Sequence, residues 1–179
     1  MSDAPVDLRA IQAPLKASYR EDPATALATM TVRSAGSDLA NPLRCEIAPD
    51  AAPGVVWESG AHAGVGGDGG MPCSGDLLLG ALAACQEITV RMVAAAMGME
   101  LEELEVVVSG DIDLRGTLGL SRDVPVGLTD IRCDTRVTIA GEHDPERASR
   151  LLKSADRYCV VLSTLRNGID VKSTFALDG

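Results

Sequence analysis

The chain has 179 residues and a formal net charge of −10, and 46% of its residues are hydrophobic but only 2% are aromatic. The negative balance argues against a surface that binds nucleic-acid phosphates, and the few aromatic side chains argue against modules that stack bases. The apolar share is enough for one substantial core built from Leu, Val, Ile, Ala and Met. We therefore expect a single domain over residues 1–179.

The first 20 residues contain no apolar segment typical of a signal peptide, and no uncharged apolar run reaches the roughly 20 residues that a membrane span needs. We therefore expect a cytoplasmic protein with no membrane partner, in which the five cysteines are reduced. The chain has only two histidines and no C-x-x-C motif, so we expect no metal site.

The first quarter of the chain predicts one helix followed by strands. Apolar residues spaced three and four apart predict a helix over residues 6–21, in which Pro14 favours a break or a kink. Residues 26–34 and 43–48 then predict the two strands of a hairpin, and residues 54–59 predict a third strand.

A glycine-dense stretch, residues 60–75, precedes a long apolar helix. It predicts either a loop with special backbone demands, such as close approach to another chain or a ligand, or a flexible linker. Ser74 is the expected N-cap of the helix, Asp76 complements its dipole in the first turn, and Gly98 is its expected stop. The helix is apolar nearly all round, which predicts burial on most sides.

The second half of the chain predicts two long strands, two helices and a last strand. The strands are expected over residues 101–115, with a bulge at Gly110, and over residues 128–140. Asp144 is the expected N-cap of the next helix, a short helix follows it, and residues 169–177 predict the last strand. Because helices and strands come in blocks, this order predicts an α+β fold with a largely antiparallel sheet.

The local surroundings of the cysteines separate two candidate reactive thiols from three expected to pack in the interior. Cys73 lies beside a helix N-terminus and Cys159 lies near Arg157, and both settings favour a lowered thiol pKa. Cys85 lies in the middle of an apolar helix, and this position alone favours an inert core thiol. The remaining two, Cys45 and Cys133, lie on predicted strands. Sequence spacing alone leaves open which thiols meet in space.

Two motifs resemble those of the osmotically inducible protein C / organic hydroperoxide resistance (OsmC/Ohr) family. The first is GDLLLGALAACQEITVRMVAAAMGM, which contains Cys85, and the second is YCVVLSTL, which contains Cys159. The block order is similar too, over roughly residues 25–177. The resemblance implies a curved, largely antiparallel sheet wrapped around a long central helix, in an interlocked homodimer with active sites at the interface. Residues 1–24 are then an N-terminal helical extension.

The same resemblance implies a peroxidase mechanism. Cys85 corresponds to the peroxidatic thiol, which attacks an organic hydroperoxide and becomes a sulfenic acid, and Cys159 corresponds to the resolving thiol, which condenses with it to a disulfide. An external dithiol, or a lipoyl-type reductant, then resets the pair, and no metal or organic cofactor is needed.

The chain departs from the family pattern at several positions. The activating Glu is expected where Gly75 stands, and Asp76 is either its replacement or simply a first-turn helix acid. Arg33 fits the place of the activating Arg, although a solvent-exposed strand-end Arg is the alternative. Val160 replaces the usual Pro. Cys73 is additional, either as a further resolving thiol or as a thiol packed under the glycine loop.

Two classes of function follow from these residues. The first is a thiol-dependent peroxidase for organic hydroperoxides. The second is a non-catalytic protein of the same fold that binds a small lipophilic ligand or a partner, or that acts as a thiol redox sensor through Cys73.

Overall fold

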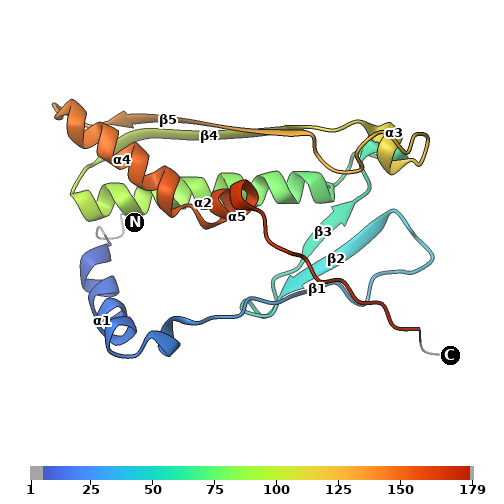
Figure 1. Ribbon diagram of the computed structural model, residues 1–179, viewed down its shortest axis with the longest axis horizontal. Helices are drawn as coiled ribbons and strands as arrows, with labels where there is room; N and C mark the ends of the chain where they lie inside the picture. The colour runs from blue at the N-terminus through green and yellow to red at the C-terminus, as the bar shows by residue number, and fades with distance from the viewer. Residues whose placement is uncertain (1–5, 178–179) are drawn as a thin grey trace. The chain divides into compact units, whose positions relative to one another are not determined.

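The computed structural model describes residues 6–177 (Figure 1). The chain divides into two compact units. The first unit extends to Ala81 and includes Val107–Asp134, whereas the second consists of Leu82–Val106 and the chain from Thr135 onward. Helix α2 and strands β4 and β5 contribute residues to both. The prediction of one domain with an N-terminal extension stays a prediction.

The first unit begins with helix α1, Leu8–Glu21, and the short 3-10 helix η1, Pro23–Ala26. The Asp7 carboxylate caps α1 by accepting the Ala10 N–H at 3.0 Å. The expected break at Pro14 does not occur, because α1 continues through this residue to Glu21. Pro14 removes only one backbone N–H donor from the helix, and the other backbone hydrogen bonds of α1 keep the helix continuous.

The first sheet is antiparallel, in the order β1-β2-β3. Its strands are β1, Val32–Arg33, β2, Arg44–Pro49, and β3, Trp57–Gly60. The predicted hairpin is therefore confirmed. The predicted strand over 26–34 shrinks to Val32–Arg33. Before it, the Thr31 carbonyl accepts the Asp50 N–H at 3.0 Å, but residues 26–30 pair with no strand in the described part of the chain. Leu27 and Met30 there are 83% and 88% exposed.

The glycine-dense stretch is an ordered segment. It contains η2, Ala63–Val65, and the left-handed backbone at Gly66, with φ of 102°, is a conformation that glycine adopts without strain. A Cβ on Gly67 would lie 1.7 Å from the carbonyl oxygen of Ala61. The loop with special backbone demands is therefore the correct alternative, and the flexible linker is not.

Helix α2, Ser74–Met97, follows this segment. Its first helical residue is Ser74, so Cys73 and not Ser74 occupies the flanking position, and the Asp76 carboxylate reaches back to accept the Cys73 N–H at 2.8 Å. Gly98 ends the helix with φ of 65°, as predicted. By length and composition α2 could cross a membrane, a property that core helices of soluble proteins share.

The core of the second unit is made by α2, by α4, Pro145–Tyr158, and by α5, Val160–Asn167. Its buried hydrophobic side chains come from all three helices and from the α4–α5 junction: Leu82, Val90, Ala94, Leu151, Ala155, Cys159 and Leu162. Asp144 caps α4 by accepting the Glu146 N–H at 2.9 Å, as predicted. Arg147 donates to the Met97 carbonyl at 2.6 Å, which joins the start of α4 to the end of α2.

The second sheet pairs β4, Leu101–Asp111, with β5, Asp130–Ile139. β4 ends before the predicted limit because Asp113 caps the one-turn helix α3, Leu114–Thr117. Residues 169–177 do not form the predicted strand. Their apolar residues are highly exposed and meet no strand within the described chain: Ile169, Val171, Phe175 and Leu177. The helices and antiparallel strands nevertheless confirm the α+β class.

Candidate active site

Cys85 and Cys159 come together in the second unit. Cys85 lies on α2 and is half-buried, and Cys159 lies between α4 and α5 and is fully buried. The Cys159 thiol is a hydrogen-bond donor to the Cys85 sulfur, and both cysteines are free thiols. The two residues that the family resemblance pairs are therefore neighbours in space, although 74 positions separate them along the chain.

The start of α5 explains why Cys159 and the residues after it face Cys85. Cys159 has extended backbone angles, φ −71° and ψ 108°, so α4 ends there and α5 begins at Val160. The side chain of Cys159 does not cap α5. The first N–H groups of a helix have no partner within it, and those of Val160 and Val161 are hydrogen-bonded to the Cys85 sulfur. The sulfur of one helix thus caps the N-terminus of another.

These contacts lower the pKa of the Cys85 thiol. Burial raises the pKa, but hydrogen bonds lower it by more, first from the Val161 N–H and then from the Cys159 thiol and the Val160 N–H. Donors aimed at a sulfur stabilise the thiolate, and a helix N-terminus adds its positive dipole end. Cys85 therefore has the surroundings of a reactive thiol rather than the inert core thiol that its sequence position alone suggests.

Two polar neighbours on α2 complete the description of this cysteine pair. The Thr89 hydroxyl donates to the Cys85 carbonyl at 2.7 Å, one turn back along the helix. Gln86, directly after Cys85, is only 7% exposed, and its Oε1 has no hydrogen-bond partner within the described residues. A buried amide oxygen without a hydrogen-bond donor lowers stability, and Gln86 Oε1 is such an unsatisfied acceptor in this unit.

Arg33 and Asp76 lie in the first unit, and each already has partners there. Arg33 forms two hydrogen bonds with Asp50, Nε–Oδ1 at 3.0 Å and Nη2–Oδ2 at 2.9 Å, and its side chain is 68% exposed. The pKa of Asp76 is lowered chiefly by the Cys73 N–H and then by the Cys73 thiol. Their roles in activating Cys85 stay predictions.

The fold and the sequence both match one protein family. Residues 67–174 match the family model described as OsmC-like protein. The chain belongs to the OsmC-like family. No match was found among curated protein sequences.

Solved structures similar to this OsmC-like protein share its fold at low sequence identity. An OsmC-like protein of unknown function from Vibrio cholerae has a TM-score of 0.61 and 11% identity, over 77% of this chain and 94% of that chain. An organic hydroperoxide resistance protein from Elizabethkingia anophelis has a TM-score of 0.58 and 18% identity, over 82% of this chain and 94% of that chain. An organic hydroperoxide resistance protein OsmC from Legionella pneumophila has a TM-score of 0.56 and 18% identity, over 82% of this chain and 95% of that chain.

The Cys73 thiol of this OsmC-like protein is a hydrogen-bond donor to the Asp76 carboxylate. Cys73 therefore lacks the electropositive surroundings expected from its place beside a helix N-terminus, because Asp76 already complements that end of α2.

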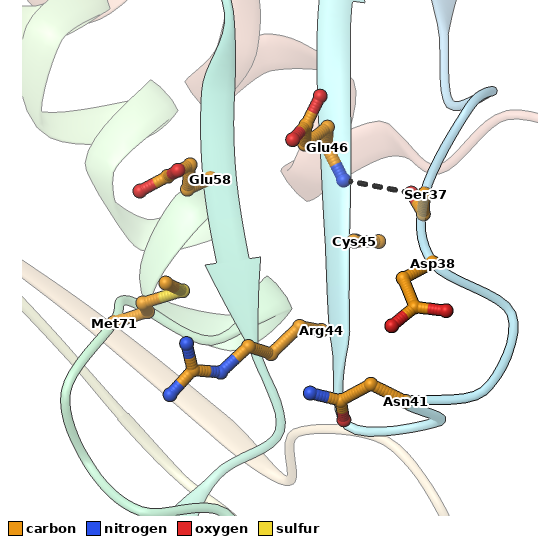
Figure 2. A pocket seen from close by; sticks show the side chains of 8 residues that line it. All are labelled: Ser37, Asp38, Asn41, Arg44, Cys45, Glu46, Glu58 and Met71. Carbon is orange, nitrogen blue, oxygen red and sulfur yellow. Dashed lines mark hydrogen bonds between the residues drawn. The ribbon is translucent and has the colours of Figure 1, made fainter.

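Cys45 and Cys133 are half-buried on strands β2 and β5, as expected for thiols that pack against neighbours. Cys45 lines a cavity of about 210 Å³, and Asp38 lines it as well (Figure 2). In the same cavity wall the Glu46 N–H donates to the Ser37 Oγ at 3.0 Å. Across the residues that the structure describes, no group of three His, Cys, Asp or Glu side chains could hold a metal ion.

Sequence reasoning missed the donors that act on Cys85. Val160 stood out only as a replacement for the usual Pro, and Val161 and Thr89 were not singled out. One signal in the sequence could have found them, namely the position of Cys159 directly before a short predicted helix. The first N–H groups of a helix have no partner within it, so they lie beside any group that the preceding cysteine contacts.

Proposed function

We propose that this OsmC-like protein is a thiol-dependent peroxidase that reduces organic hydroperoxides. The observation that carries the proposal is the Cys85–Cys159 pair, in which Cys85 has a lowered pKa and its sulfur already contacts a second thiol. The names of the Elizabethkingia and Legionella relatives, both organic hydroperoxide resistance proteins, support the same reading.

In the proposed reaction the Cys85 thiolate attacks the terminal oxygen of ROOH. The O–O bond breaks, the leaving alkoxide takes a proton to give ROH, and Cys85 becomes a sulfenic acid. The Cys159 thiolate then attacks the Cys85 sulfur, hydroxide leaves as water after protonation, and a disulfide remains. An external dithiol reduces that disulfide through a mixed disulfide, which restores both thiols and needs no bound cofactor.

The hydrogen bonds at Cys85 fit the first of these steps. They hold the sulfur as a thiolate at lower pH than a free cysteine, and a thiolate is the nucleophile. The second step needs a thiol within bonding reach, which Cys159 supplies. Because Cys159 is fully buried, it is protected from direct oxidation and reacts only with its neighbour.

We further propose that the active form is a homodimer in which the sheets wrap around the long helices. Large apolar side chains lie open on the surface of the second unit, including Ile88 at 54%, Met92 at 39% and Val160 at 63% exposure. Burying such side chains against a second copy would be strongly favourable. Light scattering of the eluted protein tests this: a mass of one chain would refute the dimer.

Two observations favour the non-catalytic alternative. Arg33 is engaged by Asp50 in a two-bond ion pair, and Gly75 stands where the family's activating Glu is expected. On this alternative Cys85 keeps its environment, but no cation assists the attack on a peroxide.

Stopped-flow oxidation of the reduced protein separates the two functions. We expect one equivalent of cumene hydroperoxide to consume two thiols rapidly, faster than hydrogen peroxide does, and peptide mapping to find a Cys85–Cys159 disulfide. Cys85→Ser should abolish the reaction, and Cys45→Ser is the matched control that should not change it. Slow loss of thiols with no defined disulfide would refute the peroxidase.

A further inference from the structure

A second cavity lies wholly within the first unit, among residues that the cysteine pair does not use. Its volume is about 390 Å³, and it is bounded by the η2 segment, by the start of α2 and by residues 110–128. Its lining combines apolar side chains with polar ones, which include the hydroxyls of Ser74 and Thr117. The residues that matter here are His62, Cys73, Asp76, Leu79, Leu114 and Leu128.

Glycines make this cavity possible. A Cβ on Gly64 would lie 2.3 Å from Leu114 Cδ1, and a Cβ on Gly110 would lie 3.2 Å from Leu128 Cδ2. Any larger residue at Gly64 would push Leu114 out of its place in the wall. Because glycine has no side chain, the glycine-dense loop packs closely against Leu114, and this close packing determines the position of the apolar wall of the cavity.

Asp76 and His62 provide the polar end of the cavity. The Asp76 carboxylate accepts two bonds from Cys73, its N–H and its thiol, which leaves acceptor positions free on a carboxylate that has about four. His62 accepts the Gly64 N–H on Nδ1 at 3.0 Å, so the neutral ring carries its proton on Nε2. The polar end thus offers one acceptor and one donor.

The charge at this end excludes an anionic ligand. The N-terminus of a helix ordinarily attracts anions, but the Asp76 carboxylate already occupies that end of α2. No Lys or Arg lines the cavity. A carboxylate or phosphate head group would face Asp76 without a fixed counter-charge.

We infer that this cavity binds a small neutral molecule with an apolar body and a hydroxyl head group. The hydroxyl donates to Asp76 and accepts from His62 Nε2, and the body lies against Leu79, Leu114 and Leu128. An ammonium head would satisfy Asp76 but would present only donors to the His62 N–H. The inference goes beyond the peroxidase proposal and does not depend on it, because neither Cys85 nor Cys159 lines this cavity and the test contains no peroxide.

The test is a titration of the full-length, reduced, ¹⁵N-labelled protein with 1-hexanol, followed by amide chemical shifts. Hexylamine and hexanoate, of the same chain length, are the matched probes. We expect saturable shifts at Gly64, Leu114 and Leu128 with hexanol, weaker binding of hexylamine, and none of hexanoate. Bound hexanol should also slow alkylation of Cys73 by N-ethylmaleimide while leaving Cys45 unaffected.

Two variants and their controls locate the binding. Ile112→Trp should fill the cavity and abolish the hexanol shifts, and since Ile112 is 43% exposed the fold has room for the larger ring. Leu118→Trp, at a 51% exposed position outside the lining, should bind hexanol as before. Asp76→Asn should remove the discrimination against hexanoate, whereas Asp123→Asn should not.

Three results would overturn the inference: no saturable shift with hexanol, equal binding of all three probes, or hexylamine binding more tightly than hexanol. If Ile112→Trp fails to fold by circular dichroism, the Cys73 protection in the unmodified protein still decides the outcome.

Discussion

The hydrogen bond from the Val160 N–H to the Cys85 sulfur can be removed by one substitution that the backbone already accommodates. Val160→Pro deletes the N–H, and proline is favoured at the first position of a helix, which Val160 occupies. A proline also requires extended angles in the residue before it, and Cys159 already has φ −71° and ψ 108°. The variant should therefore fold while losing one donor to the thiolate.

The size of the effect follows from that single bond. A hydrogen bond to a charged group contributes about 1.5–3 kcal/mol, and we take the low end because Cys85 is partly exposed and its other donors remain. About 1.4 kcal/mol corresponds to a roughly tenfold smaller thiolate fraction at a pH below the pKa. The remaining thiolate is more nucleophilic, with a Brønsted coefficient of about 0.4–0.5, so the net rate falls about three- to fourfold.

The assay is the reaction of the reduced protein with 4,4′-dithiodipyridine as a function of pH, with Cys85 identified by peptide mapping. The pH profile of Val160→Pro should move to higher pH. Val160→Ala, which keeps the N–H and removes only an exposed side chain, is the control and should match the unmodified protein. A profile for Val160→Pro that coincides with that of Val160→Ala would show that this N–H does not stabilise the thiolate.

Four other changes have expected outcomes. Cys159→Ser should leave oxidised Cys85 as a sulfenic acid that dimedone traps; an intramolecular disulfide in that variant would contradict the assignment of the resolving thiol. Asp144→Ala should lower the free energy of unfolding by about 1 kcal/mol in urea, through loss of the α4 cap. Leu151→Ala, at a fully buried position, should cost about 2–5 kcal/mol in the same measurement. The pKa of Asp113 is lowered from 3.8 to about 2, first by the Arg115 side chain. A lowered folded-state pKa means that this contribution to stability is present above pH 3.8 and is lost as the pH falls towards 2. Arg115→Ala should raise the NMR-measured pKa part of the way towards its ordinary value, because the backbone N–H at position 115 remains as a donor to Asp113.

The sequence correctly predicted those helix ends that depend only on residues a few positions apart. Asp144 followed by Pro145 predicted the start of α4, and Gly98 predicted the end of α2, because caps and left-handed glycines act within a few residues. The same reasoning failed for residues 26–31 and 169–177. A strand needs a partner elsewhere, and the alternation of apolar residues does not say whether one is present.

The candidate site was predicted only in part, for a related reason. Cys85 and Cys159 were paired through the family resemblance, since nothing in their spacing shows that α2 and the α4–α5 junction meet. The donors at Val160 and Val161 are backbone groups, which every residue but proline carries. Only the three-dimensional position of a helix start turns such a group into part of a site.

A helix whose cap is a sulfur from another helix has a stability that follows the chemical state of that sulfur. The Cys159 side chain does not cap the N-terminus of α5, and the Cys85 sulfur accepts the Val160 and Val161 N–H groups there. When Cys85 enters a disulfide it loses its negative charge, and the Val160 and Val161 amides lose a charged acceptor worth about 1 kcal/mol to a helix end. In the oxidised protein the start of α5 would instead be anchored to α2 by the covalent bond at Cys159, so oxidation exchanges hydrogen bonds for a disulfide as the link between the two helices.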